Sequence, residues 1–320
     1  MNIVTGRRAT PPDTPGYPFV HEAVFYRDDA GYVSGVVPFI QDGLRCGEPV
    51  LVAVPAANVD LVRSALGPKA AQVRFVNMAE AGRNPGRIIP GVLHAFISAH
   101  AARHPRVVGE PIWAGRSVAE YPGCVQHEAL INAAFAGIPA SILCPYDAAR
   151  LGRAVLADAA RTHPVLVDGD RREASHEYAE PDAVVAAFNR PLPEPGVPPV
   201  STTVDRDALG ALRRLVAEFA ASVGLHPARI ADLQLAVNEL ATNSITHAGG
   251  SGTVRLWRED GHLVCEVRDK GRFTPRLAGR IPPPVSSEHG RGLLLVNHLC
   301  DLVQTYTGPD GTAVRLHLYP

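Results

Sequence analysis

A proline-rich stretch at residues 190–199 constrains this 320-residue chain more than any other feature. It reads Arg190-Pro-Leu-Pro-Glu-Pro-Gly-Val-Pro-Pro199, and each proline removes a backbone donor and fixes φ. Regular structure does not continue through such a segment, which acts as a stiff spacer. We therefore expect a linker over residues 190–200 between two domains, 19–189 and 201–320, each of ordinary domain size. Residues 1–18, rich in Pro, Thr and Gly, are expected to be a flexible leader.

Composition excludes several classes of protein. Apolar residues make up 46% of the chain and charged residues 20%, which is enough for two packed cores. Basic and acidic residues number 18 and 20 up to residue 200 and 13 and 12 after it, so direct nucleic-acid binding is not expected. No apolar run resembles a signal peptide or a membrane span. Five scattered cysteines in such a chain indicate reduced thiols and a cytoplasmic location.

The first domain alternates apolar, β-branched runs with helical patterns. This order, with strands that are apolar without alternation, predicts an α/β fold with a mostly parallel sheet. Strands are predicted over residues 23–26, 49–54, 72–76, 106–112 and 140–145. Helices are predicted over residues 33–45, 59–66, 87–104, 128–135 and 148–161.

The second domain has a different order of elements. Two helices, over residues 205–223 and 227–247, precede a hairpin whose strands span 253–259 and 263–269. The hairpin is turned by Asp260-Gly261, a strong hairpin signal. A proline-containing loop, a helix from Gly290 and two more strands follow. This order predicts an α+β sandwich of two layers.

Polar residues on the 227–247 helix form the first candidate site. Glu239, Asn243 and His247 are spaced by four residues and therefore share a helix face. A carboxamide oxygen suits Mg²⁺, whose shell nucleotide phosphates can complete. A carboxylate one turn earlier can accept a proton from an attacking hydroxyl. The alternative is a solvated helix face without chemistry.

Two glycine-containing motifs follow. Asp269-Lys-Gly271 comes at a strand end, where a carboxylate can accept a hydrogen bond from an adenine amino group and glycine permits close approach. Gly290-Arg291-Gly292 opens an apolar helix whose free N–H groups suit a phosphate. Thr312 in the last hairpin could add a hydroxyl, and the loop over residues 272–289 is a candidate nucleotide lid. Each motif alone is also an ordinary turn or helix start.

Taken in order, these motifs resemble the GHKL ATPase superfamily, and its anti-sigma factor serine/threonine kinase branch most of all. The resemblance implies a Mg²⁺ ligand at Asn243 and a general base at Glu239. It implies ATP contacts at His247, Asp269, Gly271, Gly290, Arg291, Gly292 and Thr312. The turn DKGRF lacks a second glycine often found in this superfamily, which leaves the lid geometry open. No phosphoacceptor helix precedes the block, which argues against a self-contained histidine kinase.

The first domain resembles the MEDS sensory domain, whose fold is similar to RecA-like ATPases. The resemblance rests on His21-Glu-Ala-Val-Phe-Tyr26, Val37-Pro-Phe-Ile-Gln-Asp-Gly-Leu44, Gly109-Glu-Pro-Ile-Trp113, His127-Glu-Ala-Leu-Ile-Asn132 and Cys144-Pro-Tyr-Asp147. Gly82-Arg-Asn-Pro-Gly-Arg87 lacks the ending of a phosphate loop, so this domain is expected to sense a small molecule or a partner. The candidate sensor pocket comprises Tyr26, Glu110, Trp113, His127, Glu128, Asn132, Cys144, Tyr146 and Asp147. Glu110 and Trp113 follow a strand, at the edge where open α/β sheets bind ligands.

A metal site is not expected in the first domain. Cys124-x-x-His127, Cys144 and His163 supply ligand types but no second close pair. His100 and His104 share a helix face in an Ala-rich stretch. Ordinary core thiols and surface imidazoles are the expectation.

The pairing of the two domains resembles the actinobacterial anti-sigma regulators of the RsbA family. The resemblance implies a cytosolic switch that binds ATP and Mg²⁺, phosphorylates a serine or threonine of an anti-anti-sigma partner, and holds a sigma factor. A homodimer is a further implication. Three alternatives stay open: a non-catalytic ATP-dependent sigma-binding module, a histidine-kinase-like subunit, and a sensor whose kinase domain has decayed.

Overall fold

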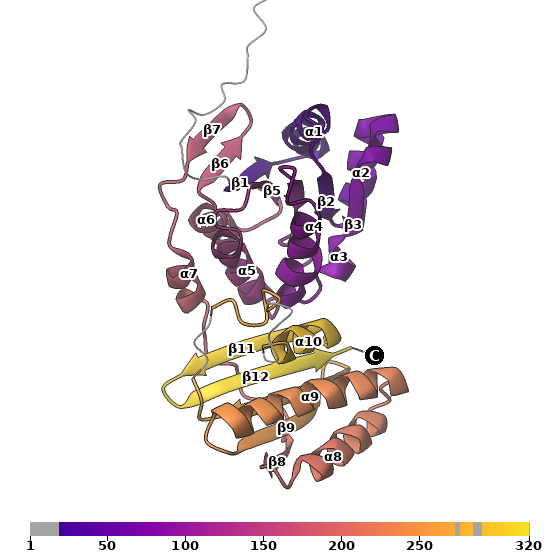
Figure 1. Ribbon diagram of the computed structural model, residues 1–320, viewed down its shortest axis with the longest axis vertical. Helices are drawn as coiled ribbons and strands as arrows, with labels where there is room; N and C mark the ends of the chain where they lie inside the picture. The colour runs from indigo at the N-terminus through magenta and orange to yellow at the C-terminus, as the bar shows by residue number, and fades with distance from the viewer. Residues whose placement is uncertain (1–18, 273–275, 284–289, 320) are drawn as a thin grey trace, which may run out of the picture.

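The computed structural model describes residues 19–272, 276–283 and 290–319, which form two layered units (Figure 1). The first unit is built on a seven-stranded sheet and the second on a five-stranded sheet. The expected leader, residues 1–18, lies outside the described residues, as do residues 273–275 and 284–289 of the predicted lid. Within the described ranges, no helix has the length and apolar character needed to cross a membrane.

Strands β1 to β6 of the first sheet run parallel, and β7 pairs antiparallel with β6 at one edge. The order across the sheet is β3-β2-β4-β5-β1-β6-β7. The strands are β1 (Phe19–Tyr26), β2 (Val50–Val54), β3 (Arg74–Asn77), β4 (Arg106–Gly109), β5 (Ala140–Asp147), β6 (Val165–Asp168) and β7 (Arg171–Ala174). Because β2, β4 and β5 are almost wholly buried, their sequences are apolar on both faces.

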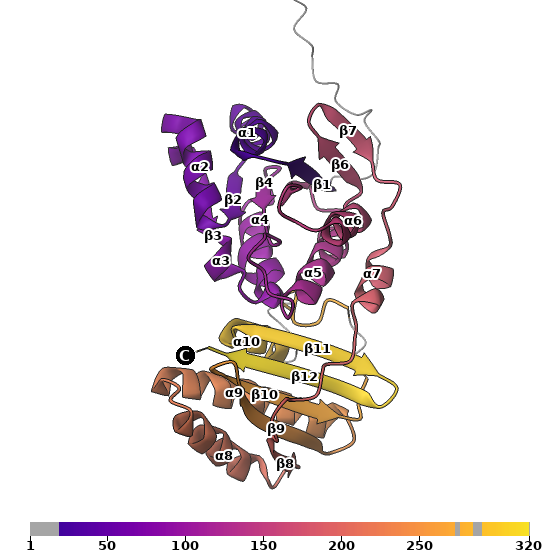
Figure 2. The ribbon, with the colours of Figure 1, turned by 180° about the vertical axis from the view of Figure 1, so that it is seen from behind.

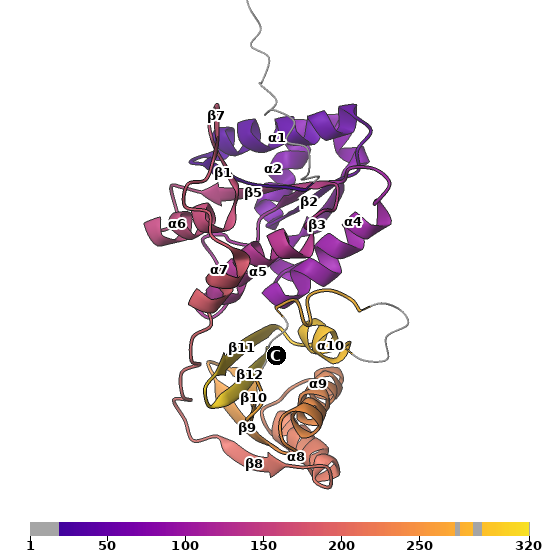
Figure 3. The ribbon, with the colours of Figure 1, turned by 60° about the vertical axis from the view of Figure 1, so that its left-hand side comes forward.

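Helices cover both faces of the first sheet, which gives this unit three layers (Figure 3). On one face, α1 (Asp29–Arg45) and α2 (Ala56–Leu66) enclose a core with Val24 and Val52. The other face is covered by α3 (Met78–Ala81), α4 (Ala95–Ala99), α5 (Tyr121–Ala134), α6 (Arg153–Thr162) and α7 (Pro181–Ala187). Ala23 and Ala53 belong to this second core because successive strand residues point to opposite faces. The α/β prediction is confirmed.

The helix predicted over residues 87–104 is instead divided into three parts. A 3₁₀ turn, η2 (Pro85–Arg87), is followed by a π-helical turn, η3 (Ile88–His94), and then by α4. Pro90 lies inside η3, where it has no N–H for an α-helical bond and its ring crowds the preceding turn. The wider π-helical bonding accommodates it. The prediction was wrong because the apolar spacing continues through Pro90.

Other differences from the prediction are spread over the first domain. The strand predicted over residues 106–112 ends at Gly109, and Pro111 shortly follows. The β6–β7 hairpin, α7 and a 3₁₀ turn, η1 (Gly67–Gln72), were not predicted. Strand β7 is fully exposed, so its sequence has no apolar side to reveal it.

The second unit packs three helices on one face of an antiparallel sheet. The sheet order is β11-β12-β10-β9-β8. The strands are β8 (Val200–Val204), β9 (Gly252–Glu259), β10 (His262–Asp269), β11 (Leu302–Gly308) and β12 (Gly311–Leu318), and the helices are α8 (Leu209–Ser222), α9 (Pro227–His247) and α10 (Gly292–Leu299). Asp260 and Gly261 both have positive φ, as the predicted hairpin turn requires. The two-layer α+β prediction is confirmed.

The outer face of this second sheet carries a buried ionic cluster. Glu266 is fully buried and accepts hydrogen bonds from Arg255, Arg268 and Arg315. The linker runs across this face (Figure 2), where Glu194 pairs with Arg255 and Arg268. The proline-rich segment is therefore held against the sheet that it precedes.

The two units meet where α10 approaches η2. Arg87 of η2 donates hydrogen bonds to the carbonyls of Asn297, His298 and Cys300, at the C-terminal end of α10. The last carbonyls of a helix lack partners within the helix, so the first domain supplies a C-terminal cap for a helix of the second. Asn84 adds a hydrogen bond of 2.9 Å to the Asn297 carbonyl.

Polar contacts extend this interface toward the sheet. The side chain of Asn189 pairs with the backbone of Thr307 through bonds of 2.7 and 3.1 Å. Gln304 of β11 donates to the carbonyl of Ala119 at 3.1 Å. The position of α10 and β11 is therefore tied to the first domain by several hydrogen bonds.

Candidate functional site

The polar face of α9 meets the first residue of α10. A methyl group built on Gly292 would lie 2.7 Å from Glu239 Oε2 and 3.7 Å from Asn243 Nδ2. Glu239 and Asn243 are both half-buried. Within the described ranges, neither side chain has a hydrogen-bond partner. A carboxylate, a carboxamide and a helix start thus converge, with both polar groups available to a ligand.

The Asp269 turn lies next to this face and is held from two sides. Ser244 Oγ donates to Asp269 Oδ2 at 2.6 Å, and the backbone N–H of Gly271 donates to Asp269 Oδ1 at 2.8 Å. Thr312 donates its hydroxyl to the Gly271 carbonyl at 2.8 Å. The Asp269 carboxylate is therefore fixed in orientation at the end of β10, and the hydrogen bond from Thr312 of β12 also holds the turn. Ser244 was not among the predicted site residues, although it adjoins Asn243.

Glycine is required at two positions of this turn. A methyl group on Gly311 would lie 1.9 Å from the Asp269 carbonyl oxygen, and φ there is +124°. A methyl on Gly271 would lie 2.7 Å from Ala248 Cβ. The turn, the β11–β12 hairpin and the end of α9 can pack this closely only because these residues have no side chain.

The remaining residues predicted to contact the nucleotide are exposed. They are His247, Gly290 and Arg291. His247 is the last residue of α9 and is exposed. Gly290 has φ +94°, a conformation that favours glycine, and the exposed Arg291 occupies the N-cap position of α10. The structure brings six of the predicted residues together where the C-terminal half of α9 meets the end of β10 and the start of α10. They are Glu239, Asn243, Asp269, Gly271, Gly292 and Thr312.

These residues fit a nucleotide with a divalent ion. The unpartnered oxygen of Asn243 is the ligand type that Mg²⁺ prefers. The missing side chain at Gly292 leaves the start of α10 open, where N–H groups favour phosphate. The oriented Asp269 carboxylate can accept from an adenine amino group.

The described part of the predicted lid is docked on the first domain. Leu277 and Ile281 pack against the core that lies under α5, and Arg280 donates to the Pro85 carbonyl at 2.9 Å. Burial lowers the pKa of Arg280 to about 10. Arg276 pairs with Asp182 of α7 at 2.9 Å. Asn297 of α10 donates to the Gly279 carbonyl at 3.1 Å, so residues 276–283 are in contact with both units.

The predicted sensor pocket is divided into two clusters. In the first, Glu110 follows β4 and is 1% exposed. Its carboxylate lies 2.7 Å from Asn58 Nδ2, 3.3 Å from the Tyr26 hydroxyl and 3.4 Å from the Tyr32 hydroxyl. Burial raises the pKa of Glu110 to about 8, so this carboxyl is largely protonated at neutral pH. Asp147 lies near this cluster and further raises the pKa of Glu110.

The second cluster lies deeper, between β1, β5 and α5. Glu128 Oε2 is 3.2 Å from His21 Nε2, 3.3 Å from His163 Nε2 and 3.6 Å from Cys144 Sγ. All four side chains are buried. Burial alone would raise the pKa of Glu128, but His163 and His21 together lower it well below its ordinary value. Asn132 and Tyr146 border this cluster.

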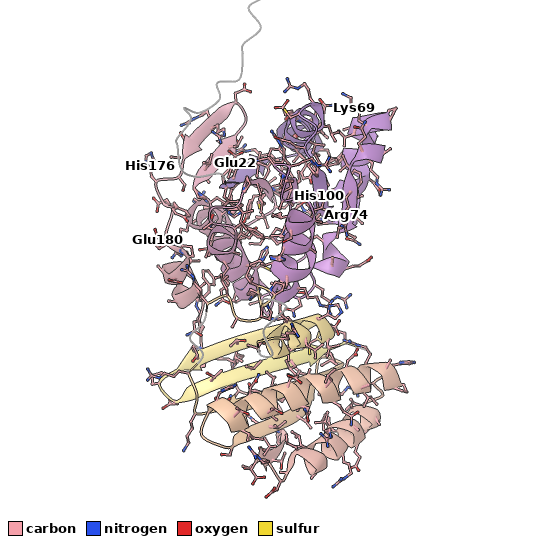
Figure 4. All side chains as sticks on the ribbon, viewed as in Figure 1. Glu22, Lys69, Arg74, His100, His176 and Glu180 are labelled. Atoms are coloured by element: carbon pink, nitrogen blue, oxygen red, sulfur yellow. The ribbon has the colours of Figure 1, made fainter. Side chains whose placement is uncertain are left out.

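The expectation of surface imidazoles was wrong for the two most buried histidines. His163 is 0% and His127 is 1% exposed. Neither Cys124 nor His127, which are spaced as Cys-x-x-His in the sequence, belongs to the cluster. Sequence spacing missed His21 because that residue comes from a strand more than 100 positions before Glu128. His100 conforms better to expectation, since Figure 4 places it beside Arg74 at the edge of the first domain, where both line a surface hollow.

Trp113 joins neither cluster. Its ring lies under the Arg116 guanidinium, 4.0 Å from ring centre to Arg116 Cζ. Arg116 in turn donates to the carbonyls of Pro111, Gly82 and Arg83. Trp113 thus stabilises the loop after β4 instead of lining a pocket with Glu128.

Comparison with known families gives two matches along the chain. Residues 20–164 match the MEDS family, described as the methanogen/methylotroph, DcmR sensory domain. Residues 202–318 match the histidine kinase-like ATPase domain. The chain therefore joins an N-terminal MEDS domain to a C-terminal histidine kinase-like ATPase domain, and the latter implies ATP binding.

More distant similarities add little. No curated protein matches the chain. One similar solved structure is that of the RsbU and RsbW domains of Rv1364c from Mycobacterium tuberculosis, with 23% identity and a TM-score of 0.30. The match covers 38% of this chain and 32% of that one, so the chain spans about a third of that protein's length.

Proposed function

We propose that this protein is a cytosolic, sensor-linked anti-sigma regulator that binds ATP and Mg²⁺. In this proposal its ATPase domain phosphorylates a serine or threonine of an anti-anti-sigma partner, and the phosphorylation state of that partner controls the release of a sigma factor. The histidine kinase-like ATPase domain supports the ATP-binding part. The motif resemblance to the anti-sigma kinases supports the choice of partner.

One observation carries the catalytic part of the proposal. Glu239 and Asn243 both face Gly292 at the start of α10, without other partners in the described ranges. Phosphoryl transfer depends mostly on positioning and on neutralisation of charge. ATP with Mg²⁺ would supply the phosphoryl group and most of the positive charge.

The chain's own residues have distinct roles in this proposal. The Asn243 carboxamide oxygen would hold the ion, and the N–H groups at the Gly292 end of α10 would orient phosphate. Asp269, fixed by Ser244 and Gly271, would orient the adenine ring of ATP. The Glu239 carboxylate, a half-buried group one turn from Asn243, would accept the proton of the partner's hydroxyl.

Contacts between the domains support the link to a sensor. Residues 276–283 lie between the Asp269 turn and α10, and Arg280 and Leu277 of this segment contact the MEDS domain. Arg87 of the MEDS domain caps the far end of α10. A shift of η2 or α5 would therefore be transmitted to the helix whose first residue adjoins Glu239.

ATP binding can be tested with a fluorescent ATP analogue and full-length protein. Asn243→Ala should remove Mg²⁺-dependent binding, whereas Glu239→Gln should bind normally. Thr242→Ala, an exposed neighbour on the same helix, is the matched control. Undiminished Mg²⁺-dependent binding by a folded Asn243→Ala variant would refute the ligand assignment.

Phosphoryl transfer requires the partner. A pull-down from cytosol with and without ATP would identify bound proteins, and radiolabelled ATP would then be added to the purified pair. Acid-stable label on the partner with wild type, and none with Glu239→Gln, is the expected result. ATP-dependent binding without label would favour the non-catalytic module, and acid-labile label would favour histidine chemistry.

A further inference from the structure

The buried cluster in the MEDS domain has the composition of a metal site. His21, Glu128, Cys144 and His163 each offer one ligand atom, and these atoms all lie within 4.8 Å of one another. The side chains of His21, Glu128 and His163 are all 0% exposed. The four residues come from β1, α5, β5 and the end of α6, so only the folded domain assembles them.

The spacings agree with tetrahedral coordination. Metal–nitrogen and metal–oxygen bonds of about 2.0–2.1 Å and a metal–sulfur bond of about 2.3 Å place tetrahedral ligands roughly 3.3–3.6 Å apart. The cluster shows 3.2 Å for His21 Nε2 to Glu128 Oε2 and 3.3 Å for His163 Nε2 to Glu128 Oε2. Cys144 Sγ lies 3.4 Å from His21 Nε2 and 3.6 Å from Glu128 Oε2. These four of the six ligand-to-ligand distances match a Zn²⁺-sized centre, and the other two are within 4.8 Å.

The other ring nitrogen of each histidine is held by an outer partner. His163 Nδ1 lies 2.8 Å from the Ala159 carbonyl, which can only accept. His21 Nδ1 lies 3.1 Å from Asn132 Oδ1, and Asn132 uses its amino group on the Thr162 carbonyl at 2.8 Å. In the neutral rings, both Nδ1 atoms therefore carry the proton, and both Nε2 lone pairs point into the cluster. Histidines that bind metals are fixed in this way by their second nitrogen.

Unpaired polar atoms occur on the cluster residues Glu128 and His163 and on the bordering Tyr146. In the described residues, His163 Nε2, Glu128 Oε1 and the Tyr146 hydroxyl are buried without a hydrogen-bond partner. A lone pair on His163 Nε2 facing a carboxylate oxygen at 3.3 Å is repulsive unless a proton or a metal ion lies between them. Buried polar groups without partners are uncommon in folded proteins, and a bound ion is one explanation for them.

We propose that His21, Glu128, Cys144 and His163 bind one divalent transition-metal ion, with Zn²⁺ the best fit. Two imidazoles, a carboxylate and a thiolate are ligands of borderline softness, which suits Zn²⁺ and Co²⁺ and disfavours Mg²⁺ and Ca²⁺. Binding releases the Cys144 thiol proton to solvent. The site is separate from the proposed nucleotide site and does not depend on ATP.

The competing arrangement is a metal-free ion pair between Glu128 and one protonated histidine. The two arrangements differ in a measurable way. Only the metal site retains an ion in the presence of a chelator, and only the metal site has a metal–thiolate bond. Full-length protein expressed with Zn²⁺ or Co²⁺ in the medium, then purified in the presence of a chelator, provides the test. The ion enters during folding because the ligands are buried.

Mass spectrometry of the purified protein should find about one Zn²⁺ per chain, as a single four-ligand site requires. The Co²⁺ form should show a thiolate-to-metal charge-transfer band. Cys144→Ser should lose this band, whereas Cys124→Ser, a control that removes another buried thiol of the same core, should keep it. Asn132→Leu, which removes the partner of His21 Nδ1 together with the bond to the Thr162 carbonyl but none of the four ligands, should weaken metal binding about 10- to 100-fold.

Two results would overturn the proposal. One is a wild-type protein that is folded by circular dichroism and holds no metal after either expression. The other is bound Co²⁺ without a thiolate band, or with a band that Cys144→Ser retains, since the ion would then lie elsewhere. The wild-type measurements decide the matter even if a ligand variant does not fold.

Discussion

Replacing Arg87 with alanine should loosen helix α10 without unfolding either domain. The Arg87 guanidinium donates to three carbonyls at the C-terminal end of α10, on Asn297, His298 and Cys300. It places a positive charge at the negative end of that helix dipole, next to Arg229, which donates to the Leu299 carbonyl at 2.7 Å. Arg87 itself belongs to the other domain, so its removal leaves the sequence of α10 intact.

The size of the effect follows from these contacts. A hydrogen bond to a charged group contributes about 1.5–3 kcal/mol, and a favourable charge at a helix end adds up to about 1 kcal/mol. The three bonds share one half-buried guanidinium, and water can reach the carbonyls once it is gone. We therefore expect a total loss of about 2–3 kcal/mol, equivalent to an opening equilibrium about 30- to 150-fold larger.

Hydrogen exchange measured by mass spectrometry reports this opening directly. Amides of α10 in Arg87→Ala should exchange about 30- to 150-fold faster than in wild type, while amides of β9 and β10 should not change. Arg206→Ala, at an exposed position of the same chain, is the control. If α10 exchanges at the wild-type rate in Arg87→Ala, the cap across the interface does not hold the helix, and the proposed link between sensor and nucleotide site loses its main support.

Two further predictions concern single residues. Gly292→Ala places a methyl group 2.7 Å from Glu239 Oε2, at the end of a flexible side chain, so phosphoryl transfer should fall while the free energy of unfolding changes by less than about 1 kcal/mol. The control is Gly210→Ala in α8, where a methyl meets no atom within 4 Å and transfer should not change. Equal transfer by both variants would contradict the placement of Glu239. The raised pKa of Glu110, about 8 against an ordinary 4.5, means that the folded state binds more protons than the unfolded chain between these values. The free energy of unfolding should therefore fall as pH rises from 4.5 to 8, by at most about 5 kcal/mol from this group. Glu110→Gln should remove that part of the fall in denaturant titrations, and an unchanged pH slope would contradict the burial argument.

Much of the ATPase domain was predictable because its determinants are local. The bounds of α9 agree with the prediction at both ends, since Pro227 suits a first helical turn and the helix ends just before Gly249 and Gly250. The four-residue spacing of Glu239 and Asn243 puts them on one face of any α-helix, whatever that helix packs against. Asp260-Gly261 fixed the hairpin by its backbone preference alone.

Contacts between distant segments were not predictable in this way. Ser244 orients Asp269 across 25 positions of sequence, and Arg87 caps α10 across more than 200. His21 and His163 meet Glu128 only because β1 and the end of α6 are brought to α5 by the parallel sheet. Nothing in the spacing of these residues distinguishes them from other polar residues in apolar surroundings.

The sequence by itself determined the two fold classes and supplied the three candidate nucleotide motifs, because helix periodicity, strand apolarity and turn chemistry act over a few residues. Only the tertiary structure decided how the predicted sensor residues divide into the Glu110 cluster and the Glu128 cluster. It also decided that α10 is held from the first domain. Burial and charge at these sites depend on which distant side chains share a small volume, and that is a property of the packed chain as a whole.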